Sequence, residues 1–484
     1  MENKILPILK YSYDNLADEH IKSCFLYCAL FPEDYAIVKE SLIECWICEG
    51  FIGEYQVLKR AVNKGYELLC TLIRANLLTE FGTIKVGMHD VIREMALWIA
   101  TDLGKQKESF VVQAAVGLHD VPKVKDWGAV RRMSLIGNHI KDITQPISMC
   151  SQLTTLLLQK NGLDYLSEQI SELTSLQYLD VSYTNIRQLP ASFRGLKKLT
   201  HLNLTGTERL CSIRGISKLS SLTSLKLLNS KVHGDVNLVK ELQHLEHLQV
   251  LTISISTDSG LEELLGDQRL AKCIDSLSLR PIYLSLLMSM ENLRHINVTN
   301  IDVSEIDTNE NWRKSKRNSS GLHNPTVPYF FTNLSTVGIV DLNGMTDLTW
   351  LLFAPNLVKL HVGNSEEVKE IINKKKAKKV TGTSPPFQKL EMILLEGLPK
   401  LESIYWTPLP FPFLKKIVKL ECPKLRKLPL NATSVSRVDE LSIVMKPEEE
   451  AQLEWEDEDT KNRFSPLISL VTIFFLILSR SMSA

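Results

Sequence analysis

The chain has 484 residues, which is more than one compact hydrophobic core usually holds, so two or more domains are expected. Its 56 Lys and Arg residues balance its 56 Asp and Glu residues, giving a formal net charge of zero. This balance excludes a long-range field that would draw the chain to nucleic acid or to an acidic membrane. Nine scattered cysteines and an N-terminus without the shape of a signal peptide indicate free thiols in a reducing, cytoplasmic compartment.

The first 103 residues have the period and length of helices in four segments, which are residues 6–16, 20–31, 39–52 and 63–78. Two short strand-like runs follow on either side of Gly82, and Asp90 is placed to cap a helix over residues 91–100. Helices followed by a small hairpin and a further helix predict a winged-helix domain over residues 1–103. Residues 104–130 are polar, contain Gly and Pro, and are predicted to form a linker.

A repeated phrase, L-x-x-L-x-L followed by a polar bend, dominates the rest of the chain. Its first four copies are spaced by 23 residues and begin at Leu153, Leu176, Leu199 and Leu222; later copies begin at Leu248, Ile274, Leu293, Leu334, Leu357, Leu390 and Leu414. One unit of about 20–29 residues cannot bury its own apolar face, so the units must stack and align their strands in a parallel sheet. The pattern predicts a leucine-rich-repeat solenoid over residues 131–463.

The residues between the repeated leucines are expected to project from the concave face of that sheet, as Gln177, Tyr178, Asp180 and Ser182 do in the second copy. Polar inserts at 309–324 and 374–386 are expected to be loops, whose basic clusters are either solvated or in contact with phosphate or an acidic partner. Residues 448–459 form an acidic run. The apolar run Leu467–Leu478 is shorter than the roughly 20 residues of a spanning helix. For residues 464–484, a buried or disordered tail and a weak attachment to the plasma membrane both stay open.

Three blocks in the first domain carry a resemblance: Cys24–Asp34, Trp46–Ile52, and Met88–Asp90 with its continuation to Ala96. In this order, ahead of leucine-rich repeats, they resemble the C-terminal part of the nucleotide-binding (NB-ARC) domain of plant nucleotide-binding leucine-rich-repeat disease-resistance proteins of the coiled-coil subclass. The resemblance covers roughly residues 1–463. It implies an α/β chain in which a mainly helical winged-helix domain precedes a solenoid with parallel strands on its concave face.

The resemblance also implies a binding site. In this family the winged-helix subdomain closes over ADP, and the histidine of the Met-His-Asp motif contacts the β-phosphate. Carried over, His89 would hold the phosphate and Asp90 would support it by capping the following helix and positioning His89. An imidazole can donate a hydrogen bond to phosphate, so His89 would act as a latch that senses the bound nucleotide. No catalytic or metal-binding residue is predicted.

The phosphate-binding pattern Gly-x-x-x-x-Gly-Lys-Ser/Thr does not occur in this sequence. The resemblance would place that loop, and the family's coiled coil, before residue 1. We therefore expect weak binding of ADP or ATP by this chain and no hydrolysis, so that an ATPase would require the missing loop from elsewhere.

The resemblance implies a protein of plant innate immunity, whose repeats recognise a pathogen protein or a guarded host protein and whose winged helix relays this to an ADP/ATP switch. One alternative is a non-catalytic decoy or modulator of a full-length receptor. Another is a winged-helix protein that binds nucleic acid, which is less favoured because the candidate helix over Leu42–Phe51 is acidic and apolar.

Two further patterns have a structural interpretation. The pairs Cys24/Cys28 and Cys45/Cys48 have spacings that suggest zinc, but their apolar neighbours predict packing in a core. Aromatic residues near Pro408 are expected to fill the repeat core, although an exposed Tyr or Trp there would suit a binding hot spot; they are Tyr405, Trp406, Phe411 and Phe413.

Overall fold

The computed structural model describes most of the chain, in residues 6–52, 58–81, 85–101, 109–143, 149–255, 257–279, 293–302, 331–378 and 385–470. The predicted turn at Gly82, the insert at 309–324 and residues 471–484 of the predicted tail lie outside these ranges. Two compact units make up the chain. The first comprises Met1–His233 and Lys240–Leu251, and the second Gly234–Val239 and Thr252–Ala484.

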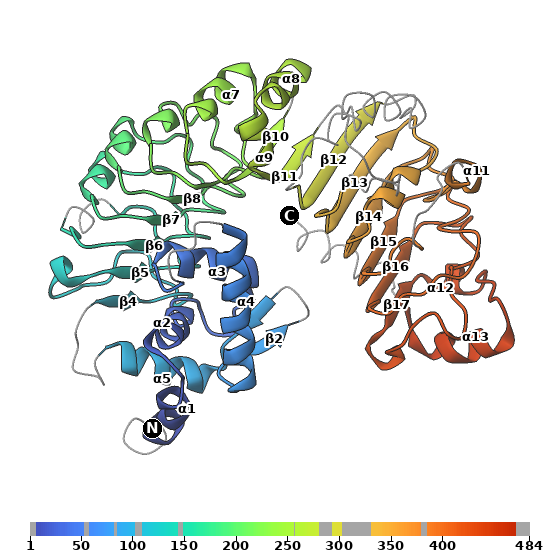
Figure 1. The fold of residues 1–484 in the computed structure, drawn as a ribbon, viewed down its shortest axis with the longest axis horizontal. Coiled ribbons are helices and arrows are strands. Elements are labelled where there is room, and N and C mark those ends of the chain that lie inside the picture. Colours follow the sequence, from blue (N-terminus) through green and yellow to red (C-terminus); the bar gives the residue numbers. More distant parts are fainter. Residues whose placement is uncertain are drawn as a thin grey trace, which may run out of the picture. The chain divides into compact units, whose positions relative to one another are not determined.

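The predicted winged-helix domain is confirmed at the start of the first unit (Figure 1). Its helices are α1 (Leu6–Asp14), α2 (Glu19–Cys28), α3 (Lys39–Cys48), α4 (Leu58–Arg74) and α5 (Asp90–Ala100). Its antiparallel sheet has the order β1-β3-β2, with bounds Ile37–Val38 for β1, Thr79–Phe81 for β2 and Lys85–Gly87 for β3. Helix α2 begins where the sequence provides a cap, because the Asp18 carboxylate accepts a hydrogen bond of 2.9 Å from the amide of Ile21.

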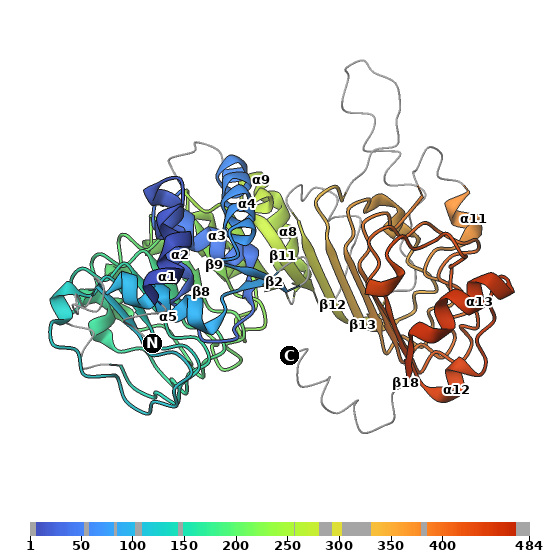
Figure 2. The ribbon, with the colours of Figure 1, turned by 90° about the horizontal axis from the view of Figure 1, so that it is seen from below.

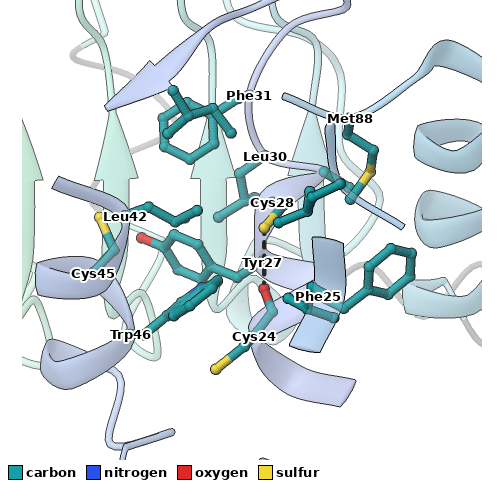
Figure 3. Packing of buried hydrophobic residues seen from close by; sticks show 14 of the residues in the cluster. Cys24, Phe25, Tyr27, Cys28, Leu30, Phe31, Leu42, Cys45, Trp46 and Met88 are labelled. Atoms are coloured by element: carbon teal, nitrogen blue, oxygen red, sulfur yellow. Dashed lines mark hydrogen bonds between the residues drawn. The ribbon is translucent and has the colours of Figure 1, made fainter. Parts of the chain in front are cut away.

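Three cysteines of the first domain, Cys24, Cys28 and Cys45, lie in its apolar core. Figure 3 shows Cys24 and Cys28 on α2 next to aromatic side chains, with Cys45 and Trp46 presented by α3. The thiol of Cys28 donates to the carbonyl of Cys24 at 3.3 Å. Burial raises the pKa of the Cys45 thiol to about 12, so this group behaves as a small apolar side chain.

The strands of the first unit confirm the parallel arrangement that the repeat predicts. They run in the order β4 (Phe110–Val112), β5 (Arg132–Ser134), β6 (Thr155–Leu157), β7 (Tyr178–Asp180), β8 (His201–Asn203) and β9 (Ser224–Lys226), each parallel to the next. Their register aligns residues 23 positions apart in rows across β5–β9, of which one contains Arg132, Thr155, Tyr178, His201 and Ser224. Short 3₁₀ turns connect the repeats: η1 (Trp127–Ala129), η2 (Glu168–Glu172), η3 (Ala191–Gly195) and η4 (Ile216–Lys218).

The sheet begins earlier than predicted. Strand β4 lies inside residues 104–130, which were expected to form a linker, and Phe110 of β4 is paired with Arg132 of β5. The run Phe110–Val112 is too short to carry the leucine phrase, so the sequence pattern does not mark it. The backbone N–H and C=O groups of β4 nevertheless form hydrogen bonds with β5, whose edge would otherwise be unpaired.

A buried polar residue follows each of the strands β5 to β9 and closes the bend. The amide of Asn161 donates to the carbonyls of Leu135 and Leu158 at 2.7 and 2.9 Å. The hydroxyls of Thr184 and Thr207 donate in the same way to carbonyls three residues before them, at 2.7 and 2.6 Å. These bonds satisfy buried backbone acceptors, which explains why the bend in the repeated phrase is polar.

The second unit continues with parallel strands: β11 (Ile274–Leu279), β12 (His295–Asp302), β13 (Thr336–Asn343), β14 (Lys359–Gly363), β15 (Met392–Glu396), β16 (Lys416–Leu420), β17 (Ser442–Met445) and β18 (Ile468–Leu470) (Figures 1 and 2). Its helical segments are α8 (Asp258–Gly266), α9 (Gln268–Lys272), α11 (Lys374–Ala377), α12 (Pro447–Glu450), α13 (Glu458–Phe464), η7 (Thr349–Phe353), η8 (Val438–Glu440) and η9 (Ser465–Leu467). Helix α7 (Val236–Gln243) and strand β10 (Val250–Ile255) contain residues of both units.

Two predictions about the second unit are wrong. The sheet extends past residue 463, because Ile468–Leu470 forms β18 and pairs with β17; the first residues of the expected tail are therefore part of the solenoid. The insert at 374–386 was expected to be a loop, but its first part is helical, as α11. The acidic run contributes α12 and the start of α13.

A buried ion pair fastens α12 to the repeats. Lys419 occupies a leucine position of the phrase that begins at Leu414, and its side chain is only 1% exposed. Its ammonium group lies 2.9 Å from the carboxylate of Glu449, which also accepts a hydrogen bond of 2.8 Å from the amide of Cys422. Lys419 and Glu449 thus form a buried ion pair at a position where the repeated phrase normally has a leucine.

Candidate functional site

The predicted latch residue lies at the start of α5. His89 is exposed and is the N-cap of this helix, and its Nδ1 accepts a long hydrogen bond of 3.4 Å from the amide of Val91. An imidazole whose Nδ1 accepts carries its proton on Nε2 in the neutral state. The exposed ring therefore has a donor, Nε2–H, at a helix N-terminus, where the helix dipole favours negative charge.

The prediction that Asp90 caps this helix is wrong. The helix starts at Asp90 itself, one residue earlier than expected, and His89 takes the capping position. Histidine can replace the usual Ser or Asp at this position because its unprotonated Nδ1 accepts a hydrogen bond from a backbone amide that has no partner within the helix. The Asp90 carboxylate lies in the first turn, where its negative charge stabilises the helix by interacting with the positive end of the helix dipole.

Arg93 connects this motif to the preceding block. Its side chain is 10% exposed, and its Nε donates to the carbonyl of Phe31 at 2.7 Å. Its Nη1 lies 3.5 Å from the carboxylate of Glu33. Burial lowers the pKa of Arg93, while Glu33 and Asp90 act in the opposite direction. Arg93 therefore fixes the beginning of α5 against the turn that follows α2, a role that the sequence reasoning did not identify.

The other face of the winged helix is docked on the repeats. Glu49, which ends α3, forms an ion pair with Arg132 of β5, and its side chain is only 4% exposed. The same carboxylate accepts hydrogen bonds from Thr154, at 3.2 Å, and from Thr155. These partners supply the hydrogen bonds that a buried carboxylate requires.

A second ion pair joins the same two elements further along the sheet. Glu44 of α3 lies 2.5 Å from the ammonium group of Lys226 on β9, and both side chains are less than one-fifth exposed. Between the two pairs, the Cys48 thiol lies 3.2 Å from the Thr200 hydroxyl. Since Glu49 reaches β5 and Glu44 reaches β9, α3 runs across the strands (Figure 1).

This docking changes the interpretation of the residues expected to project from the repeats. Tyr178, Asp180 and Ser182 are 3%, 6% and 4% exposed, so they do not present a free recognition surface. Tyr178 belongs to the same apolar core as Tyr27 and Cys45 of the winged helix. The outward face of β5–β9 is therefore already occupied by the protein's own helix.

The covered face has perturbed electrostatics. Burial, with a smaller effect of Lys226, lowers the pKa of His201 to about 3. His201 stacks on Tyr178 with ring centroids 5.7 Å apart. Burial also raises the pKa of Asp180, although Ser182 and Asn203 donate hydrogen bonds that oppose the shift. Both shifts favour the neutral form of the group, because an uncompensated charge on this buried face would be costly.

Contacts run from the latch to this interface. The amide of Arg93 donates to the His89 carbonyl at 2.9 Å, and the Arg93 side chain holds Phe31 at the end of α2. On the same helix, Tyr27 meets the ring of Phe51 edge to face, with centroids 6.1 Å apart. The guanidinium of Arg132 lies over that ring at 5.1 Å.

Comparison with known families agrees with this architecture. Residues 30–96 match the winged helix domain of disease resistance proteins, and residues 111–417 match a leucine-rich repeat region. The chain is therefore a leucine-rich-repeat protein with a winged-helix domain. It belongs to the plant disease resistance proteins that combine these two parts.

Individual relatives are similar over nearly the whole chain. Disease resistance protein UNI of Arabidopsis thaliana is 58% identical over 97% of this chain and 55% of that protein. Disease resistance protein RPS5 of the same plant is 47% identical over 96% of this chain and 56% of that protein. The chain spans about half the length of these curated relatives.

Among solved structures, an internalin from Listeria monocytogenes is similar over 63% of this chain and 88% of its own chain. Its sequence is 18% identical and its TM-score is 0.42, so this likeness is remote. In the described ranges, no helix has both the length and the apolar character needed to cross a membrane.

Proposed function

We propose that this chain serves in plant defence as a sensing and switching module, whose repeats bind a protein partner and whose winged helix passes that event to an ADP/ATP switch. The docking of α3 across β5–β9 carries this proposal, because any movement of the repeats must act on the winged helix. The nine cysteines all lie in the described ranges and form no disulfide, which fits a reducing compartment such as the cytoplasm. The role is one of binding and regulation, and catalysis is not part of it.

In this proposal, His89 holds a phosphate of the nucleotide. Its exposed Nε2–H donor, placed at the N-terminus of α5, has the chemistry that an anion requires. Asp90 supports it as the first residue of the helix, and Arg93 holds the helix start in place. The relatives' disease-resistance names and the match to their winged helix domain support this assignment.

The nucleotide part is tested by isothermal titration with ADP. We expect weak binding by this chain alone, since its sequence holds no phosphate-loop pattern. Adding in trans a polypeptide that carries the phosphate-loop pattern should strengthen binding, and His89→Ala should then weaken it about tenfold, as for a lost charge-assisted hydrogen bond. His244→Ala, at an exposed histidine of a repeat, is the control. Equal affinities for both variants would contradict the latch.

A role in nucleic-acid binding finds less support. Helix α3, the candidate recognition helix, presents Glu44 and Glu49 to the repeats, where Lys226 and Arg132 neutralise them. A helix engaged in this way is not available to a DNA groove, which also repels carboxylates.

A further inference from the structure

The bends of the first unit place one residue per repeat in the left-handed region of the backbone, with φ between 56° and 69°. These residues are 23 positions apart, and the amide of each donates to a carbonyl of the next repeat: Gly137 to Gln159, Lys160 to Ser182, Tyr183 to Thr205 and Gly206 to Leu228. Glycine adopts this conformation without strain, whereas a lysine or a tyrosine does not. Lys160 and Tyr183 therefore occupy positions that their own backbone preference disfavours.

The side chains of these two residues explain why they stand there. The ring of Tyr183 lies against Gly206, where an added Cβ would come within 2.5 Å of it, so this tyrosine packs on the neighbouring bend. Lys160 instead reaches the winged helix: its ammonium group lies over the ring of Tyr35, 5.4 Å from the ring centroid. Strain that is kept for a contact between two domains points to a function of that contact.

The loop that carries Tyr35 contacts the chain on both sides of the latch residue, His89. At the beginning of the loop, the carbonyl of Phe31 accepts a hydrogen bond of 2.7 Å from Nε of Arg93, in the first turn of α5. At its end, the carbonyl of Tyr35 lies so close to Gly87 that a Cβ there would be 3.2 Å from the oxygen. The Phe31 and Tyr35 rings stack, with centroids 5.7 Å apart, so the two ends of the loop are held together.

We propose that Lys160 is a positioning residue for the latch: it holds the Tyr35 ring, and through it the loop over residues 31–35, which fixes the chain before and after His89. This inference rests on the proposed function, because it concerns the regulation of the same site. The contact links the repeats to the latch without passing through α3. A shift of the bend at Lys160 is therefore transmitted to His89 by the loop.

Hydrogen exchange of the whole chain tests this contact. In Lys160→Met, which removes the charge but keeps an unbranched side chain, the amides of residues 33–37 and 88–93 should exchange about two- to fivefold faster, as expected for the loss of an exposed cation–π contact. Tyr35→Leu should have the same effect. Lys160→Arg and Tyr35→Phe should exchange as the unaltered chain does, because each keeps a cation over an aromatic ring.

Two further variants separate this role from a general effect on stability. Lys22→Met is the matched control, because Lys22 also lies over a tyrosine ring, that of Tyr13 at 5.7 Å, and it should leave residues 88–93 unchanged. Lys160→Asn relieves the backbone strain while removing the contact, so strands β6 and β7 should stay as protected as before while residues 88–93 exchange faster.

Two results would overturn the proposal. The first is unchanged exchange of residues 88–93 in both Lys160→Met and Tyr35→Leu. The second is equal acceleration of β6, β7 and residues 88–93 in Lys160→Asn, which would make Lys160 a structural part of its repeat only. No nucleotide is present in these measurements, so their outcome is independent of the ADP titration that tests His89 itself.

Discussion

At the scale of single residues, His201 shows how strongly the docked winged helix alters its surroundings. Its imidazole stacks on Tyr178, and burial, with a smaller effect of Lys226, lowers its pKa to about 3. In the unfolded chain the same group takes up a proton near its ordinary value of about 6.5. The unfolded state therefore binds more protons between these values, and the contribution of His201 to stability, complete above pH 6.5, is lost as pH falls towards 3.

This sign gives a measurable expectation. Between pH 7.5 and 5.0, the free energy of unfolding of the unaltered chain should fall by up to about 2 kcal/mol more than that of His201→Gln, because each pH unit is worth at most about 1.4 kcal/mol. Urea denaturation at the two pH values measures the difference. His244→Gln, at an exposed histidine, should follow the unaltered chain. An identical pH dependence for His201→Gln and the unaltered chain would rule out the burial of a neutral imidazole.

Lys419 gives a second expectation at this scale. The variant Lys419→Met leaves the Glu449 carboxylate buried without its cation and should cost about 3 to 5 kcal/mol of stability. Adding Glu449→Gln should restore most of this loss, because a neutral amide oxygen can still accept the bond from Cys422. Denaturation of the single and double variants measures both effects. If the double variant is as unstable as Lys419→Met, the loss of stability comes from the changed side-chain volume and not from an unpaired charge.

At the scale of elements, the pair Glu49–Arg132 is expected to hold α3 on the repeats. A double-mutant cycle with Glu49→Gln and Arg132→Gln should give a coupling free energy of about 1–3 kcal/mol, because both side chains are largely buried. The pair Arg426–Glu454 is the matched control: its groups lie 3.9 Å apart, its side chains are 63% and 64% exposed, and its coupling should be close to zero. Equal couplings for the two pairs would mean that burial does not strengthen the contact of α3.

The elements also show what a sequence can predict. The 23-residue leucine spacing was sufficient for the parallel sheet, and the helical periods for the winged helix, because both depend on which side chains must be buried. Strands β4 and β18 were missed since backbone pairing at a sheet edge needs no leucine phrase. The ion pair of Lys419 was missed for another reason: its partner, Glu449, is 30 residues away, in an acidic run that carries no local signal for a buried contact.

The candidate site was predicted unevenly. A sequence motif was sufficient to select His89 and Asp90 as candidates. It did not show that His89 caps the helix in place of Asp90, because a sequence does not fix the first residue of a helix. The contacts of Glu44 and Glu49 were not predictable at all, because they join residues that are 182 and 83 positions apart. Acidic residues on a helix carry no local signal for such partners.

At the scale of the whole molecule, one repeated scaffold makes different contacts in different copies. In the first unit the outward face of β5–β9 holds α3, and in the second unit Lys419 of β16 pairs with Glu449 of α12. The residues that differ between copies decide which contacts a repeat makes.

The central claim is that a disturbance at the repeats reaches the latch through α3 and α2, and hydrogen exchange tests it most directly. In Arg132→Glu, which places a like charge against Glu49, the amides of α3 and those of residues 88–93 should exchange faster than in the unaltered chain, while strands β14–β16 should not change. Arg426→Glu, at an exposed ion pair, should leave both segments unchanged. Faster exchange confined to α3, with residues 88–93 unaffected, would contradict the relay.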